Sequence, residues 1–157
     1  MPIEALDRTD RRILDALQHD GRMTNQDLAD AVGLSPSPCL RRVRQLEAAG
    51  AISGYVALLD PAAAGLEVSA FVRVRLVQQD DRHLAVFERS VREFPEVMEC
   101  YLIAGESDYQ LRVLVRSLQA FEDFLRTKLT QIEGIAQVQT SFALRRIVYR
   151  TAIPIDT

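Results

Sequence analysis

Apolar residues in the first third of the chain recur every three to four positions, which is the spacing of amphipathic helices. A first helix is predicted to begin at Asp7 and to end near Gly21, because leucine and isoleucine recur at helical spacing between them. A second helix follows Thr24, which can cap it together with Asp27 at the third helical position. Gly33 ends this second periodic pattern and suits a turn that requires a positive φ.

A third helix is predicted to begin within residues 35–38, because serine favours the N-cap and proline favours the first helical position. At about 100° per residue, Cys39, Val43 and Leu46 fall on one side of this helix. The opposite side carries Ser37, Pro38, Arg41, Arg44 and Gln45, with Arg42 on the flank. No acidic residue occurs from position 35 to 45, so this free face is expected to be positive. Two helices joined by a tight glycine turn, with arginines on the second, predict a helix-turn-helix that binds DNA.

After residue 60 the pattern changes to strand, helix, strand, and then repeats. Alternation predicts strands at 68–77, 97–104, 109–115 and 135–149, and helical spacing predicts helices at 84–94 and 121–132. This β-α-β-β-α-β order is that of the ferredoxin-like unit, in which helices cover one face of an antiparallel sheet. The other face is predicted to carry alternate residues such as Val113 and Phe142. Such a face is too apolar to leave in water, so it predicts a partner subunit.

The boundary between the two parts is marked by a change in composition. Alternating apolar residues at 52–59 predict a short strand that leaves the helical part. Asp60 and Pro61, three alanines and Gly65 then follow. We therefore expect an α+β protein with three segments. These are a helix-turn-helix domain with its exit strand at 1–60, a linker at 61–66, and a ferredoxin-like domain at 67–157.

Composition limits the classes of partner. The 157 residues carry a net charge of −3, which argues against a general polyanion binder, so DNA contacts must come from local placement of arginines. Cys39 and Cys100 lie in different predicted domains and lack metal-type spacing, so both are expected to be buried thiols. No apolar run reaches about 18 residues, and the N-terminus lacks a signal-peptide core. We therefore expect a cytoplasmic protein without a membrane partner.

An enzyme is the first alternative class. His19 lies at a helix end and His83 begins a helix, so each is expected to be a surface or capping residue rather than a general base. No nucleophile–base set, Walker loop, dinucleotide fingerprint or metal-spaced cluster is readable in the sequence. We therefore expect no catalytic site, no metal site and no cofactor.

Two stretches resemble a known family. The segment from Leu34 to Tyr55, LSPSPCLRRVRQLEAAGAISGY, closely resembles the recognition segment of the Lrp/AsnC (leucine-responsive, feast/famine) transcription regulators. The segment from Glu99 to Val113, ECYLIAGESDYQLRV, resembles the effector-domain signature of that family. The resemblance implies a winged-helix-like DNA-binding domain followed by a ferredoxin-like domain that binds amino acids. It also implies homodimers that pack through their sheets and assemble into octamers or similar rings.

The resemblance also implies two sets of site residues. For DNA binding these are Asn25, Gln26, Ser35, Ser37, Pro38, Arg41, Arg42, Arg44 and Gln45. For effector binding they are the loop residues Gly105, Glu106, Asp108 and Tyr109 and the strand residues Thr140, Ser141, Phe142 and Ala143.

Elementary chemistry supports the effector loop to a limited extent. Gly105 lets the backbone approach a small ligand, and the carboxylate of Asp108 can meet an α-ammonium group. The alternative is that residues 105–108 are only a hairpin turn. Leucine-responsive members of the family carry bulkier residues than Ser141 and Ala143, so methionine or another apolar amino acid is an alternative to leucine.

Two further functions remain open from the sequence. The chain could be an architectural DNA-binding protein without an effector response, because sequence does not separate packing of DNA from regulation. It could also be an amino-acid-binding oligomerisation module whose first 60 residues contact protein. The arginine-bearing face favours DNA, because protein interfaces are usually centred on apolar or aromatic anchors and the predicted free face has none.

Overall fold

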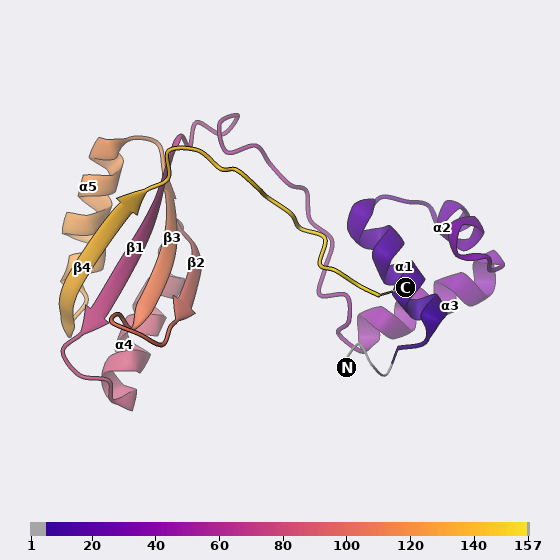
Figure 1. The fold of residues 1–157 in the computed structure, drawn as a ribbon, viewed down its shortest axis with the longest axis horizontal. Coiled ribbons are helices and arrows are strands. Elements are labelled where there is room, and N and C mark those ends of the chain that lie inside the picture. The colour runs from indigo at the N-terminus through magenta and orange to yellow at the C-terminus, as the bar shows by residue number, and fades with distance from the viewer. Residues whose placement is uncertain (1–5, 157) are drawn as a thin grey trace. The chain divides into compact units, whose positions relative to one another are not determined.

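The computed structural model describes residues 6–156, which form two compact units (Figure 1). The helix-turn-helix unit comprises Met1–Leu58 together with Ile147–Thr157, and the sheet unit comprises Leu59–Arg146. The sequence prediction had assigned 67–157 to a single domain. The structure differs at the C-terminal end, because the last residues of the chain group with the helices instead of with the sheet.

The helix-turn-helix unit contains α1 (Arg8–His19), α2 (Asn25–Val32) and α3 (Pro36–Ala48). Local chemistry fixes where these helices begin and end. The predicted Thr24 cap of α2 is confirmed, because its hydroxyl oxygen accepts the Asp27 N–H at 3.1 Å. Gly33 ends α2 with φ 74°, the left-handed conformation that its lack of a side chain permits.

A small core and two polar contacts set the angles between these helices. The core is formed by Leu6, Ile13, Leu28, Ala29, Val32, Cys39, Val43 and Leu46. The Arg12 guanidinium donates to the carbonyls of Ala31 and Val32 at 2.8 and 3.2 Å, which satisfies free carbonyls at the end of α2. The Asn25 amide donates to the carbonyl of Pro36 at 2.9 Å and thereby joins the start of α2 to the start of α3.

The sheet unit has the predicted ferredoxin-like order of elements. These are β1 (Val68–Leu76), α4 (Asp81–Arg92), β2 (Val97–Leu102), β3 (Tyr109–Val115), α5 (Leu118–Thr127), a 3₁₀ turn (Leu129–Gln131) and β4 (Ile135–Phe142). The strand order is β2-β3-β1-β4, and every neighbouring pair is antiparallel. The predicted α+β class and topology are therefore confirmed.

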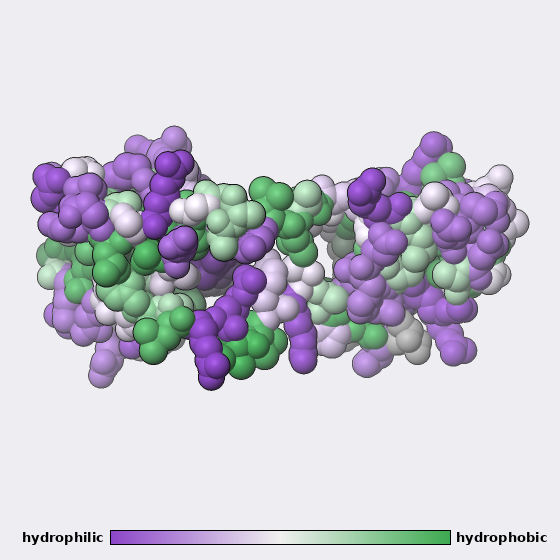
Figure 2. All heavy atoms as spheres, turned by 90° about the horizontal axis from the view of Figure 1, so that it is seen from above, coloured by the Kyte–Doolittle hydropathy of each residue, from purple (hydrophilic) through white to green (hydrophobic). Residues whose placement is uncertain are grey.

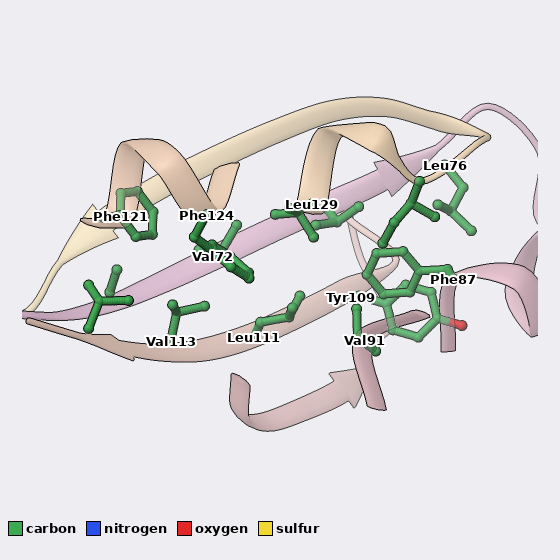
Figure 3. Close-up of a cluster of buried hydrophobic side chains, with 14 residues drawn as sticks. Val72, Leu76, Phe87, Val91, Tyr109, Leu111, Val113, Phe121, Phe124 and Leu129 are labelled. Atoms are coloured by element: carbon green, nitrogen blue, oxygen red, sulfur yellow. The ribbon is translucent and has the colours of Figure 1, made fainter. Parts of the chain in front are cut away.

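Both helices cover the same face of the sheet (Figure 3). From α4, Phe87 and Val91 are buried against the strands, and from α5, Phe121 and Phe124 are buried in the same cluster. The strands supply buried residues at alternate positions, of which Val72, Leu111 and Val113 are fully inaccessible. This layer gives the sheet unit its own hydrophobic core.

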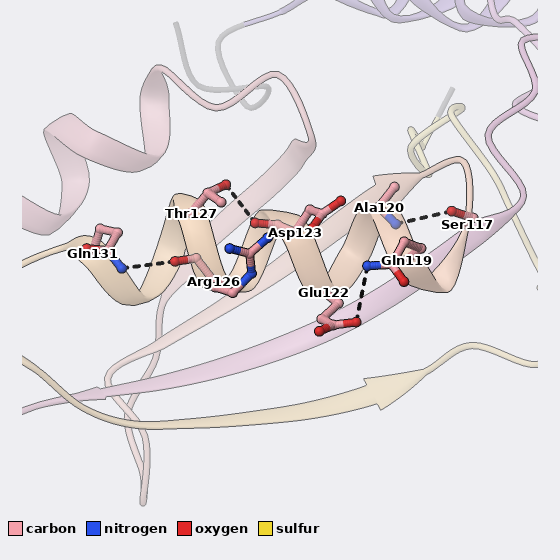
Figure 4. Close-up of polar contacts among 8 residues, drawn as sticks. All are labelled: Ser117, Gln119, Ala120, Glu122, Asp123, Arg126, Thr127 and Gln131. Carbon is pink, nitrogen blue, oxygen red and sulfur yellow. Dashed lines mark hydrogen bonds and ion pairs between the residues drawn. The ribbon is translucent and has the colours of Figure 1, made fainter.

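Polar side chains fix the ends of α5 (Figure 4). The Ser117 hydroxyl oxygen accepts the N–H of Ala120 at 3.1 Å and so caps the first turn. At the other end, the Gln131 amide donates to the carbonyl of Arg126 at 2.9 Å. These local contacts define the length of α5.

The face of the sheet that the helices leave open differs from the prediction. Val113 is fully buried beneath the helices, and Phe142 lies edge-on to Phe121 of α5 with ring centroids 5.1 Å apart. The prediction therefore placed both residues on the wrong face, one position out of phase. By strand register, the open face carries Ser69, Phe71, Arg73, Arg75, Glu99, Tyr101, Gln110, Arg112, Leu114, Gln137, Gln139 and Ser141. It is mixed in character and exposes the aromatic rings of Phe71 and Tyr101.

Two predicted strands are shorter or absent. The fourth strand ends at Phe142, where it pairs with Ala70, and does not continue to residue 149. No strand is formed at 52–59. A strand needs a neighbour for its backbone N–H and C=O groups, and neither segment has a paired strand within the described chain. Both segments expose apolar side chains, with Val56 82% and Leu144 98% exposed. Hydrophobic residues, drawn green, are visible on the surface among hydrophilic ones in Figure 2.

Candidate DNA-binding and effector sites

The free face of α3 brings four predicted DNA-binding residues together. Ser37, Arg41, Arg44 and Gln45 are exposed and line one shallow depression of about 350 Å³, together with Leu40 and Ala48. Pro36 occupies the first turn of the helix, after Ser35, which is exposed at the N-cap and makes no side-chain capping bond. The result is a surface with two guanidinium groups, an amide and a hydroxyl, which can all donate hydrogen bonds to nucleic acid.

Arg42 was expected to contact DNA, and the structure places it differently. Its guanidinium forms ion pairs with Asp7 at 2.6 Å and with Asp10 at 2.8 Å, and so joins α3 to the start of α1. These hydrogen bonds raise the pKa of Arg42. The backbone N–H of Asp10 and then the Arg42 guanidinium lower the pKa of Asp7. The helical position of Arg42 on the flank, within reach of α1, explains why it has an internal partner.

Two other predicted DNA-binding residues form hydrogen bonds within the helix-turn-helix unit, and a third is half-buried. Asn25 joins the starts of α2 and α3, as described above. The Gln26 amide donates to the Asp30 carboxylate one turn along α2 at 3.1 Å. Pro38 is half-buried. Asn25 therefore supports the start of α3, whereas Gln26 is exposed on α2 and its partner lies on the same helix.

The prediction overlooked Leu40 on the free face of α3. Leu40 is 38% exposed and lines the same depression as the arginines. The signal for it was in the sequence, because Ser37 and Arg44 lie three residues before and four residues after it on the helix.

Asp108, which was expected to contact the effector, is buried within the single chain. Asp108 is only 4% exposed. Its carboxylate accepts hydrogen bonds from the backbone N–H of Leu76, at 2.7 Å, and from the side-chain amide of Gln79. Its own N–H donates to the carbonyl of Val74 at 2.9 Å. Asp108 therefore joins the β2–β3 loop to the end of β1, and both of its carboxylate oxygens already have partners.

Tyr109, which was expected to contact the effector, is buried in the core of the sheet unit. It is 1% exposed, and its ring packs on Phe87 with centroids 4.4 Å apart. Its hydroxyl donates to the Glu88 carboxylate at 2.9 Å. Burial, and then the hydrogen bond and charge of Glu88, raise the pKa of Tyr109. The tyrosine therefore stays neutral and anchors β3 to α4.

The two cysteines are free thiols, as expected, but their burial differs. Cys39 is fully buried in the core of the helix-turn-helix unit, and burial raises its pKa. Cys100 is only half-buried, in contrast to the prediction, and burial followed by the charge of Glu88 raises its pKa to about 11. Neither thiol is therefore ionised near neutral pH.

The remaining predicted effector residues lie in two separate places. Gly105 and Glu106 are exposed in the loop before β3, where Gly105 has φ 144°. The segment 140–143 lies on the edge strand β4 and just beyond it, with Thr140 and Phe142 on the helix side and Ser141 on the open face. The strands β1 and β3 separate these two sets in the sheet. One chain therefore does not bring the two predicted halves of the effector site together.

Comparison with known proteins identifies the family. A family model for a winged helix-turn-helix DNA-binding domain matches residues 6–53, and the model for the Lrp/AsnC ligand binding domain matches residues 69–153. This chain belongs to the Lrp/AsnC family. It is thus a DNA-binding transcription regulator with an amino-acid-binding domain, as its resemblance predicted. The Lrp/AsnC assignment places it among regulators and not among enzymes.

Relatives of this Lrp/AsnC regulator match along almost its whole length. The Bkd operon transcriptional regulator of Pseudomonas aeruginosa is 45% identical over 150 residues, which cover 96% of this chain and 98% of the relative. The leucine-responsive regulatory protein of Rhizobium meliloti is 44% identical over 142 residues, which cover 90% of this chain and 91% of the relative. A crystal structure of a Neisseria meningitidis transcriptional regulator in complex with L-Met superposes on this chain with a TM-score of 0.91. The two sequences are 42% identical, and the superposition covers 96% of this chain and 97% of the other.

Other kinds of site are not apparent in residues 6–156. No group of three or more His, Cys, Asp or Glu residues is arranged to hold a metal ion among them. The helices in this range are all too short or too polar to span a bilayer. His83 lies in the first turn of α4, and its ring Nδ1 is 2.7 Å from the carboxylate of Asp80. Asp80 is the capping residue of this helix, because its carboxylate accepts the backbone N–H of His83 at 2.9 Å.

Proposed function

We propose that this Lrp/AsnC regulator acts in the cytoplasm, reads double-stranded DNA with the free face of α3, and changes its DNA affinity when it binds a free apolar amino acid. One observation carries the DNA part. Arg41 and Arg44 stand side by side with Ser37 and Gln45 on an exposed surface that contains no acidic residue. Arginine pairs with guanine O6 and N7 or with phosphate, and glutamine pairs with adenine, so this set suits a major groove.

The proposed effector site is formed by more than one subunit. The support is geometric, because the exposed loop residues Gly105 and Glu106 and the segment 140–143 lie apart within a single chain. A second copy can supply the missing half. Leucine and methionine are the first candidates, because one relative is named leucine-responsive and one structural neighbour was solved with L-Met. A ligand in such a site alters DNA binding only if its affinity differs between two assembly states.

The proposed assembly is a homodimer that associates further, with an octamer as the form that the family resemblance suggests. The support is exposed apolar surface on the open face of the sheet and along 55–59 and 144–149. Exposed patches of apolar side chains are typical of association surfaces. Light scattering at micromolar concentration should give a multiple of the 17.7 kDa chain mass, and a 17.7 kDa species would exclude this assembly.

The DNA part is tested with single arginine variants on a duplex selected by the protein from a random library. If the arginine contacts a base, Arg41→Ala or Arg44→Ala should weaken binding by about 1–3 kcal/mol. If it contacts a phosphate, the slope of log K against log salt concentration should become shallower by about one. Arg82→Ala, an exposed arginine of α4 in the sheet unit, is the matched control and should bind as the parent does. Parent-like affinity and salt dependence in both α3 variants would exclude this face as the DNA reader.

The effector part is tested by thermal-shift measurements with each of the twenty amino acids, followed by DNA titrations with any that stabilise the protein. Coupling of about 1–3 kcal/mol is typical, so operator affinity should change roughly 5- to 150-fold. Glu106→Ala should reduce the response, whereas Glu133→Ala, also exposed but outside the two predicted segments, should not. If no amino acid alters stability or DNA affinity, the protein is an architectural DNA-binding protein instead.

A further inference from the structure

Leu40 differs from the other large apolar residues of the three helices α1, α2 and α3, which are buried or half-buried. From residue 6 to residue 48, all of which the structure describes, it is the one large apolar residue that is exposed. It is also absent from the set of half-buried residues that pack against the core of this unit. Its exposure therefore has no explanation in the packing of the helices.

The surroundings of Leu40 are polar and positive. The depression that it lines is otherwise formed by Ser37, Arg41, Arg44, Gln45 and Ala48. A protein partner would be expected to meet a cluster of apolar or aromatic anchors, and Leu40 offers one anchor flanked by two guanidinium groups. A nucleic acid suits this combination better, because the arginines face its phosphates and base edges while one apolar group remains to be covered.

In duplex DNA, the apolar group that the major groove presents is the C5-methyl of thymine. We propose that Leu40 is a specificity-determining residue that packs on a thymine C5-methyl and so selects thymine over cytosine in each half-site. This inference rests on the proposed reading of DNA by α3. Arg41 is adjacent to Leu40 in sequence and Arg44 lies one turn further along the helix, so their contacts would hold Leu40 against the groove.

The test uses the full-length protein and a duplex that it selects from a random library. Each thymine of the selected site is replaced in turn by deoxyuridine, which removes the methyl group and keeps the base-pairing edge. Covering one methyl group contributes about 0.8 kcal/mol, so replacement of the contacted thymine should weaken binding of the parent protein roughly fourfold. Thymines outside the contact should give no change.

The same series is then measured with Leu40→Ala and Leu40→Met. Leu40→Ala should bind the thymine and deoxyuridine duplexes equally, whereas Leu40→Met should retain the preference because its side chain keeps similar apolar reach. Thermal unfolding of Leu40→Ala confirms that the variant is folded, as expected at an exposed position. An undiminished preference in Leu40→Ala, or no thymine that responds in the parent, would overturn the inference.

Arg41→Ala on the same duplex separates this inference from the broader proposal. If Arg41→Ala weakens binding while deoxyuridine has no effect, α3 reads DNA and the role of Leu40 is wrong. If neither Arg41→Ala, Arg44→Ala nor any deoxyuridine changes binding, the reading of DNA by α3 fails as well, and the Leu40 inference fails with it.

Discussion

The three arginines of α3 differ in what they contact, although they are close in sequence. Arg41 and Arg44 are exposed on the free face, whereas Arg42 is held by Asp7 and Asp10 at the start of α1. An arginine that is already paired with two carboxylates offers little net charge to a phosphate. Arg42 is therefore expected to orient α3, while its neighbours supply the contacts with DNA.

Arg42→Ala should lower the free energy of unfolding by about 1 kcal/mol at pH 7, because it removes a partly exposed ion-pair network. The folded-state pKa of Asp7 is lowered, so its contribution is present above the unfolded pKa of about 3.9 and is lost as pH falls through the folded pKa. The difference in the free energy of unfolding between the parent and Arg42→Ala should therefore become smaller below about pH 4. Urea unfolding of both proteins at pH 7 and at pH 3 measures this difference. If Arg42→Ala reduces the salt dependence of DNA binding as much as Arg41→Ala does, Arg42 contacts DNA instead.

Asp108 provides a second test at the residue scale. Asp108→Ala should lower the free energy of unfolding by about 1–3 kcal/mol, because the buried N–H of Leu76 loses its acceptor. Gln79→Ala is the matched control, since it removes the exposed partner and leaves the backbone hydrogen bond in place, and it should cost less. Chemical denaturation without amino acid measures both. Parent-like stability of Asp108→Ala combined with a lost amino-acid response would identify Asp108 as a ligand residue after all.

At the scale of elements, the turn between α2 and α3 sets the direction of the recognition helix. Gly33 occupies it with φ 74°, and a Cβ atom there would meet no other atom within 4 Å. Any penalty for a side chain at this position would come from backbone strain and not from a steric clash. The turn is therefore a place where backbone conformation alone can be tested.

Gly33→Ala should cost about 1–2 kcal/mol in the free energy of unfolding, the penalty of an L-residue in the left-handed region. Gly54→Ala is the matched control, because it also has open space around the added Cβ but no positive φ. It should leave stability unchanged or slightly raised. Thermal unfolding of the two variants measures the difference, and equal melting temperatures would show that the turn tolerates a side chain.

At the scale of the whole molecule, the end of the chain belongs to the helix-turn-helix unit. The Gln18 side chain donates to the carbonyl of Ile153 at 2.8 Å and accepts its N–H at 2.9 Å, as a neighbouring strand would. Thr151, Ile153 and Ile155 line a cavity of about 490 Å³ together with residues of α1 and of 50–55. The helices are thus completed by a segment that follows β4 of the sheet unit in the sequence.

Removing residues 151–157 should lower the free energy of unfolding of the helix-turn-helix unit by about 1–3 kcal/mol, because two hydrogen bonds and apolar cover are lost. Gln18→Ala should reproduce part of this loss, and Gln26→Ala on exposed α2 serves as its control. Circular dichroism during thermal unfolding follows the helical signal. A truncated protein with parent-like unfolding would show that this contact does not stabilise the helices.

The features that the sequence determined by itself are those with local causes. Capping by Thr24 requires a partner three residues away, and the left-handed turn requires only the glycine at position 33. The order β-α-β-β-α-β follows from periodicity within each segment, and the positive face of α3 follows from the spacing of residues 37–45. Such interactions are encoded within one or two turns of chain, so they can be read without a structure.

The features that only the tertiary structure decided depend on residues far apart in the chain. Asp108 finds the N–H of Leu76 32 residues away, Arg42 finds Asp7 35 residues away, and Gln18 finds Ile153 135 residues away. The face on which Val113 lies was likewise fixed by the helices that pack on it. No local pattern records such pairings, because a buried carboxylate and a ligand-binding carboxylate have the same side chain, and only the folded surroundings distinguish them.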